Sequence, residues 1–342
     1  MTTPSGQISA LDMRNEFGAT NSSGHVALGS YRVNQDISAL GELPLDTGIP
    51  QSGTISFDNM RNKKLNLVVD YYSGGTVYRQ NARDKYNNQQ VNYVGGFYTN
   101  THTTPPSAGT GTKVIIHVNK TIGSDKDGAN RCALRTGTWH SSADVRVDVG
   151  GSGKIYGAGG NGGAGAGGET NGNAGSSGSS ALGVEKSMTV NIMNGGYIQA
   201  GYGGGGGGGG GYDSDKHDDE LGSGGGGGGG AGLPVGNGGP GGDGWKADGQ
   251  PGSNGGNTTG GAFGEGGNAD NEAIGGDGGV GGQPGEDAND GGGGVGDRGT
   301  GSGGAGGDDG VAVRRTSGSI TVHYTGETDR IKGATNVTGT IS

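Results

Sequence analysis

The chain has 342 residues and a net charge of −10, and 90 of its residues are glycine. Only 27% of the residues are hydrophobic and 5% are aromatic, against roughly 45–50% apolar residues in ordinary globular proteins. So few large side chains exclude a conventional hydrophobic core over most of the chain, because their burial does not offset the entropy lost on ordering the backbone. The glycine-rich part is therefore either disordered or ordered through close backbone packing.

Charge and targeting signals narrow the function classes further. Residues 157–310 hold 19 acidic and four basic residues, a net charge of −15, which argues against a nucleic-acid partner. A single cysteine, Cys132, excludes an intrachain disulfide framework. The first 17 residues lack a signal-peptide pattern, and no run of about 18 apolar residues predicts a membrane span. We therefore expect a protein that is made in a cytoplasm and is not embedded in a membrane.

The N-terminal part contains a duplication. Residues Ser5–Asn15 recur 47 positions later as Ser52–Asn62, with seven of eleven positions identical. Each copy reads as a Gly-x-Ile segment and a serine that can cap a short helix, whose apolar residues, Leu11 among them, we expect to be buried. We interpret residues 1–62 as a small docking module for another protein. The candidate assembly residues are Ile8, Met13, Arg14, Phe17, Ile55, Phe57, Met60 and Arg61.

Residues 63–156 read as a β-domain. Segments 65–72, 113–118 and 144–149 alternate with period two and are rich in β-branched and aromatic residues, which predicts strands. We expect a small β-sandwich or an open sheet.

A second repeat joins this β-domain to the glycine tract. Val147–Val149 and Gly153–Gly160 recur 43 positions later as Val190–Ile192 and Gly196–Gly203. A repeat of this length indicates stacked, solenoid-like units. Residues 313–342 contain another alternating segment, 318–324, which we expect to return to the sheet beside Val114–Val118.

Four structures compete for the glycine tract, residues 157–312. Collagen requires glycine at every third position and much proline, whereas Gly203–Gly211 and Gly224–Gly230 are unbroken and the chain has nine prolines. A calcium-binding β-roll requires tandem nonapeptides, and only 238–246 matches once. A disordered linker has little use for scattered residues such as Trp245 and Phe263. The fourth structure is a bundle of glycine helices with three residues per turn, which hydrogen-bond to each other through bare faces.

The duplicated module and segments such as Asn194–Gly211 resemble tail-fibre and tail-tip proteins of tailed bacteriophages. The glycine runs are similar to those of polyglycine-sandwich adhesins of T4-like phages. This resemblance implies polyglycine-II helices, loops that touch a host receptor, and localisation in the virion. It also implies partners among the virion proteins, a bacterial surface receptor (an outer-membrane protein or a polysaccharide), and a homo-oligomer such as a trimer.

Candidate receptor-contact residues follow from this resemblance, because they lie between glycine runs. An exposed aromatic side chain beside polar groups suits recognition, although Trp245 and Phe263 could equally fill gaps between glycine helices. The candidates are Tyr212, Asp213, Asp215, His217, Trp245, Lys246 and Phe263.

No motif predicts catalysis, a cofactor or a metal site. The acidic segment 213–220 lacks the spacing of an EF-hand, the histidines lack metal-site motifs, and no phosphate loop is present. We expect an all-β structural protein in which a polyglycine-II-type sandwich is inserted before the final strand, after a small N-terminal module with short helices. The alternatives are an architectural virion subunit without receptor contact and a secreted or cell-wall glycine-rich protein.

Overall fold

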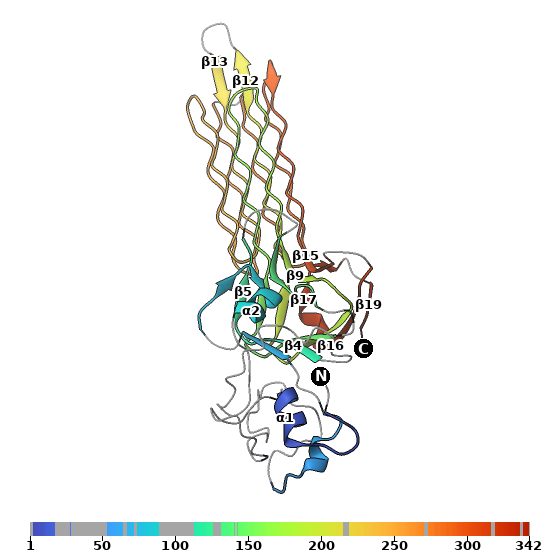
Figure 1. Ribbon diagram of the computed structural model, residues 1–342. Coiled ribbons are helices and arrows are strands. Elements are labelled where there is room, and N and C mark those ends of the chain that lie inside the picture. The colour runs from blue at the N-terminus through green and yellow to red at the C-terminus, as the bar shows by residue number, and fades with distance from the viewer. Residues whose placement is uncertain are drawn as a thin grey trace.

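The protein consists of a β-stranded body, a long shaft of extended segments that leaves the body at one end, and a small N-terminal unit at the opposite end (Figure 1). A computed structural model supplies these coordinates. It describes residues 3–17, 28, 53–63, 67–71, 74–88, 113–125, 131–139, 141, 143–214, 219–269, 273–315, 319–335 and 338–341.

The body is a parallel β-helix, in which each coil of the chain adds one strand to each of three sheets. The first sheet contains, in order, β1 (Leu67–Tyr71), β4 (Lys113–Val118), β7 (Asp144–Val149), β10 (Met188–Ile192), β16 (Thr321–Gly326) and β19 (Thr338–Ile341). The second contains β2 (Val77–Tyr78), β5 (Thr121–Gly123), β8 (Lys154–Tyr156), β11 (Tyr197–Gln199) and β17 (Ile331–Lys332). The third contains β3 (Gln80–Asn81), β6 (Cys132–Arg135), β9 (Ser180–Val184), β15 (Val311–Arg315) and β18 (Ala334–Thr335).

Ladders of apolar side chains fill the interior of the β-helix. In the second sheet, Ile122, Ile155, Ile198 and Ile331 occupy the same register position in successive coils. The first three are fully buried and belong to one core cluster, against which Ile331 packs. β-Branched residues suit such stacks because their stiff side chains pack well on a pleated surface. Because the strands are short, each forms few hydrogen bonds with its neighbours, and this stacking of side chains helps to hold each coil on the next.

The structure confirms the 43-residue repeat but not the expected sandwich. Val147 pairs with Val190 and Ile155 pairs with Ile198, so the repeat is the offset between two coils. The segment expected beside Val114–Val118 forms β16, which pairs with β10 and β19 instead. Residues 311–341 form five strands, β15 to β19, rather than one. The β-sandwich or open sheet was therefore wrong, because strands of two to six residues carry the chain in turn through three parallel sheets.

The shaft consists of two excursions from the β-helix. Residues 157–179 leave after β8 and return at β9, and residues 200–310 leave after β11 and return at β15. The excursions run back and forth along the shaft as extended segments (Figure 1). Three short antiparallel strands, β12 (Gly211–Ser214), β13 (Asp219–Gly222) and β14 (Gly299–Thr300), lie at its far end.

Backbone hydrogen bonds join the shaft segments at every third residue. The amides of Gly204, Gly207 and Gly210 donate to Ser176, Asn173 and Thr170, at 2.8–3.1 Å. The intervening amides of segment 201–210 donate to other segments, so three consecutive residues point in three directions. Segment 201–210 bonds in this way to segments 157–166, 170–179, 224–231, 276–282, 289–292 and 301–310.

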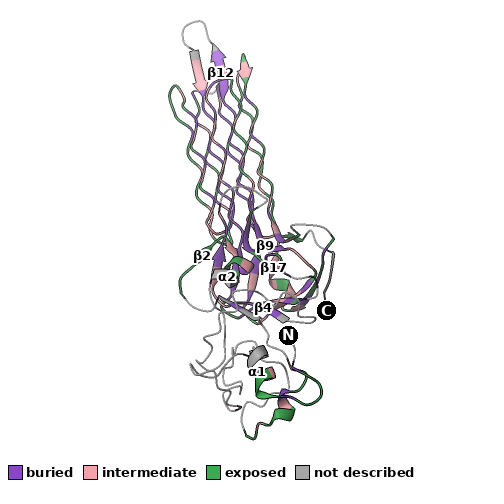
Figure 2. Ribbon diagram, viewed as in Figure 1, coloured by how far each residue is buried: buried purple, intermediate pink, exposed green. Residues whose placement is uncertain are grey.

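The two unbroken glycine runs lie at the centre of the shaft. Every residue of 201–211 and of 222–232 is buried, as the buried segments in Figure 2 show. A Cβ atom on Gly207 would lie 1.9 Å from the carbonyl oxygen of Ala164, so only glycine fits there. Outer segments keep one face in solvent: in segment 301–310, Ser302, Ala305 and Asp308 are exposed, again at every third residue.

The N-terminal unit packs the two copies of the duplication together. The copies form α1 (Ala10–Phe17) and η2 (Phe57–Met60), each preceded by a serine that bonds to the Asp or Asn three residues later. Met13 and Met60 are fully buried, whereas Leu11 and Phe57 are 60% and 41% exposed. The expected burial of Leu11 and Phe57 was therefore wrong: among the apolar side chains described in this unit, only Ile8, Met13 and Met60 are buried.

The other candidate assembly residues of the first copy are partly outside the described structure. Ile8 is buried and 9% exposed, whereas the side chains of Arg14 and Phe17 lie outside the described residues. Two further short helices, α2 (Ala82–Asn88) and η3 (Thr328–Arg330), lie on the body.

Candidate functional site

The far end of the shaft carries the candidate site, because several loops meet there on a rigid base. β12 pairs with both β13 and β14, and isolated bridges link Gly167, Ser223 and Gly267 beneath them. Among the described loops, 243–248 is short and joins two hydrogen-bonded shaft segments. The backbone hydrogen bonds of the shaft therefore support the loops, and the side chains at this tip are not needed to hold them in place.

The loop 243–248 presents the most exposed aromatic side chain at the tip. The backbone amide of Trp245 donates to the carbonyl oxygen of Leu221 on β13 at 3.1 Å. The ammonium of Lys246 lies 3.3 Å from a carboxylate oxygen of Glu220, and the amide of Gly244 donates to Asp248 at 3.0 Å.

These contacts hold the backbone of the loop while the indole of Trp245 remains 63% exposed. An indole offers a large apolar face and one N–H donor at little cost in conformational entropy. The arrangement suits contact with another molecule better than it suits filling a gap between shaft segments.

A second apolar side chain at the tip was missed by the sequence reading. Val295 is 56% exposed, and its backbone exchanges two hydrogen bonds with Ile274, at 2.7 and 2.8 Å. It interrupts the glycines between Gly291 and Gly296. That interruption is the signal that could have identified it, since a β-branched residue has no place in a bare glycine segment.

The remaining candidates occupy different environments. Tyr212 on β12 is half-buried, and Asp213 is buried and 3% exposed. Asp213 therefore faces the protein rather than the surface. Asp215 and His217 lie outside the described residues.

Phe263 lies on the flank of the shaft rather than in a tip loop. Its neighbours Gly261 and Gly264 donate to Gly229 and Gly226 at 2.7 and 2.8 Å, which places Phe263 within an extended segment. Its side chain is 42% exposed. The expectation of a loop was wrong here, because Phe263 occupies an outward-facing position of a segment whose other faces are glycine.

A shallow groove lies beside the tip on the shaft. It has a volume of about 500 Å³, and its walls are mostly glycine backbone, with Thr170, Asn171, Asn173 and Asp243. Its polar groups are hydroxyl, amide and carboxylate oxygens and backbone amides. Such walls can hydrogen-bond a polar ligand but provide little apolar contact.

Neither a metal centre nor a membrane span emerges from the described part of the chain. No group of three or more His, Cys, Asp or Glu side chains there could hold a metal ion. No helix among the described residues is long and apolar enough to cross a membrane.

Comparison with known proteins gives one family and one solved structure. A family model described as phage tail fibre adhesin Gp38 matches residues 82–336, which include most of the β-helix and the whole shaft. The crystal structure of the gp37-gp38 adhesin tip complex of the bacteriophage S16 long tail fiber shares 19% sequence identity. That match covers 96% of this chain and 98% of that chain, with a TM-score of 0.41. No curated protein matches.

Proposed function

The chain belongs to the phage tail fibre adhesin Gp38 family, and from this membership we propose that its shaft tip contacts a receptor on the host bacterium. Membership gives the chain a structural role in the tail fibre and a place in the virion. In the proposed function the protein carries out no chemistry. It holds a contact surface at the end of a stiff shaft.

The observation that carries this proposal is the exposed indole of Trp245 on an anchored loop. An exposed aromatic side chain that becomes buried when a partner binds often contributes much of the binding energy of a protein interface. Val295 would add a second apolar contact at the same end of the shaft, and Lys246 a polar one. Phe263 stands apart from this surface, so we assign it no part in the first contact.

Binding of the purified native protein to intact host cells tests the proposal. We expect Trp245→Ala to reduce binding at least 10-fold, because a truncated central aromatic residue typically costs about 2 kcal/mol or more. The matched control is Tyr78→Ala, which removes another exposed aromatic side chain, 47% exposed on β2 of the body. Full binding by the Trp245 variant, or an equal loss in both, would contradict a receptor surface at the tip.

An architectural subunit without receptor contact is the second candidate. It is favoured by the regularity of the shaft, whose hydrogen bonds are mostly between backbone groups. In that case folded wild-type protein in its native assembly would not bind host cells at all. Localisation of the protein within the particle would then become the informative measurement.

The shaft itself we assign to a polyglycine-II-type sandwich. Three residues per turn and outward-pointing N–H and C=O groups define such helices, and the three-residue hydrogen-bond period agrees with both. In this assignment the protein divides into a docking module (1–62), a β-domain (63–156), a glycine-rich domain (157–312) and a C-terminal return (313–342). Because a polyglycine-II helix has three residues per turn, each central helix of the shaft can hydrogen-bond to several neighbouring helices at once.

The N-terminal unit would attach the protein to another virion protein. Met13 and Met60 are interior, so a partner would contact the exposed and half-buried residues Ile55, Phe57 and Arg61, of which Arg61 pairs with Asp58 at 2.9 Å. We expect Phe57→Asp to prevent incorporation into particles. The comparison variant is Leu11→Asp, which places the same charge on an exposed apolar residue of the other copy. Normal incorporation of both variants would place the attachment surface elsewhere.

Sedimentation of the assembled fibre would measure the copy number, for which a trimer is our expectation.

A further inference from the structure

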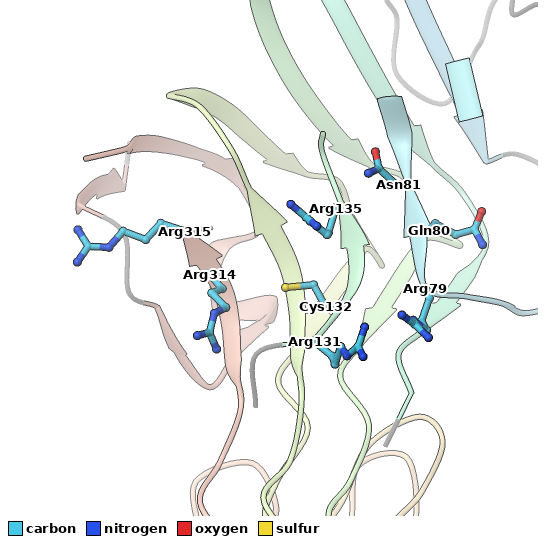
Figure 3. Close-up of a pocket in the computed structure, with 8 residues that line it drawn as sticks. All are labelled: Arg79, Gln80, Asn81, Arg131, Cys132, Arg135, Arg314 and Arg315. Atoms are coloured by element: carbon cyan, nitrogen blue, oxygen red, sulfur yellow. The ribbon is translucent and has the colours of Figure 1, made fainter. Parts of the chain in front are cut away.

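An arginine-lined pocket lies on the third sheet of the β-helix, where the shaft leaves the body (Figure 3). Its volume is about 640 Å³, within the range of small-molecule sites. Its lining is almost entirely polar. The lining residues are Arg79, Gln80, Asn81, Arg131, Cys132, Arg135, Arg314 and Arg315.

The coils of the β-helix gather these arginines from distant parts of the sequence. Arg79 precedes β3 in the first coil. In the second coil, Arg131 precedes β6 and Arg135 is its last residue. Arg314 and Arg315 end β15 in the fourth coil. Arg135 and Arg314 are both in register with Gly183 of β9, which lies between their strands. Two strand spacings separate them by about 10 Å, and the glycine between them leaves the sheet surface bare.

The charge of this pocket contrasts with that of the whole chain. Among the described residues that line it, five are arginines and none is acidic, in a protein whose net charge is −10. Arg79 pairs with Asp125 at 2.8 Å and Arg135 pairs with Glu185, yet both arginine side chains remain 50% exposed. Adjacent cations repel each other unless an anion lies among them. Guanidinium groups bind phosphate through two parallel hydrogen bonds.

Arg79 also has an unusual backbone conformation. Its φ angle is +48°, and Asn62 is the only other non-glycine residue with a positive φ in the described part of the chain. Asparagine tolerates the left-handed region, whereas a long side chain such as arginine rarely adopts it. Strained residues of this kind cluster at ligand-binding sites. The conformation points to a role for this side chain in the pocket.

We propose that this pocket binds a phosphate-bearing saccharide. The arginines would hold the phosphate groups. Gln80 Nε2 donates to the carbonyl oxygen of Tyr78, and Asn81 Oδ1 accepts from the amides of Arg83 and Asp84, so Gln80 Oε1 and Asn81 Nδ2 are the groups that would bond to sugar hydroxyls. The volume exceeds that of a single phosphate and accommodates a sugar ring. Segment 201–210 spans about 30 Å at a rise of ~3.1 Å per residue, so the pocket lies roughly that far behind the tip. Given the proposed receptor contact, it would bind anionic sugars that extend from the same cell surface.

Titration calorimetry of the full chain tests the pocket directly. The probes are glucose 1,6-bisphosphate, inorganic pyrophosphate and glucose. We expect saturable binding of the bisphosphate, weaker binding of pyrophosphate, no binding of glucose, and loss of affinity as salt is raised. Arg79→Asn and Arg131→Gln should each weaken the bisphosphate at least 10-fold. Asparagine suits the backbone at position 79, so that variant should keep the wild-type melting temperature.

The matched control is Arg330→Gln, which removes an arginine that pairs with Glu327 on η3, outside the pocket. Equal weakening by this variant, or no saturable heat with the bisphosphate, would overturn the proposal. Self-association that pyrophosphate reverses would also overturn it, since the pocket would then receive the acidic shaft of a second copy.

Cell binding separates the two sources of the ligand. If the saccharide belongs to the host surface, Arg79→Asn should reduce attachment and glucose 1,6-bisphosphate should compete. If it is a free sugar phosphate, calorimetric binding will be lost in Arg79→Asn while attachment is unchanged. Trp245→Ala should keep full calorimetric binding. Failure of the tip proposal and failure of the pocket proposal therefore give different results.

Discussion

Replacement of Gly207 by alanine tests the packing of the shaft most directly. The added Cβ atom would lie 1.9 Å from the carbonyl oxygen of Ala164 and 2.4 Å from its carbon, so the segments must separate by roughly 1 Å or more to restore ordinary contact distances. Separation strains the neighbouring hydrogen bonds from Gly207 to Asn173 and from Gly163 to Gly205, both 2.8 Å. Each buried group left unpaired costs about 1–3 kcal/mol. Loss of two such bonds gives a destabilisation of about 2–6 kcal/mol.

Thermal unfolding, followed by circular dichroism, measures this effect. At ~2.1 cal/mol/K per residue, a chain of 342 residues has an unfolding entropy of about 0.7 kcal/mol/K, so the melting temperature should fall by roughly 3–8 °C. The control is Gly292→Ala on an exposed face, where the nearest atom to the new Cβ is 3.4 Å away. That variant should melt within about 1 °C of wild type, as surface substitutions usually change stability little. Equal melting temperatures for both variants would refute the close packing of segment 201–210.

Three further predictions concern the body and the root of the shaft. Burial raises the pKa of Asp309 to about 6, against the hydrogen bond from Gly203. The folded state then binds more protons between about pH 4 and 6, so its stability falls as pH rises through that window; Asp309→Asn should flatten this part of the pH profile of urea unfolding. Ile155→Ala, in the middle of the isoleucine ladder, should cost about 2–5 kcal/mol in the same assay, and Lys154→Ala, exposed on the same strand, should cost little. Burial also raises the pKa of Cys132 to about 11, so at about pH 8 a disulfide reagent should modify it at least about 100-fold more slowly than free cysteine, until guanidinium unfolds the protein.

The sequence predicted the elements of the body better than their arrangement. Alternating segments identified β4 and β7, and the 43-residue repeat indicated stacked units, in which Val147 pairs with Val190. The β-helix was not predicted because coils differ in length. Val114 pairs with Val145, 31 residues later, whereas Met188 pairs with Val322, 134 residues later. The second glycine excursion accounts for the longer offset and hides it from a search for regular repeats.

The candidate site was predictable only where composition changes abruptly. Trp245 and Lys246 stood out between glycines, and the structure places both at the tip. The burial of Asp213 could not be read from the sequence, since it depends on the pairing of β12 with β13 and β14. The arginine pocket was equally invisible, because Arg79, Arg135 and Arg314 become neighbours only through the coil register.

The three-residue period of the shaft has a consequence for how such a chain can change. Outward-facing positions, such as Ser302, Ala305 and Asp308, recur once per turn of each segment. Deletion of a single residue would rotate every later position of that segment by a third of a turn and direct a side chain into the bundle. Deletion of three residues would preserve the facing and shorten only the segment. The length of a shaft segment can therefore change only in steps of three residues, whereas the loops that join the segments are free to change in both length and sequence.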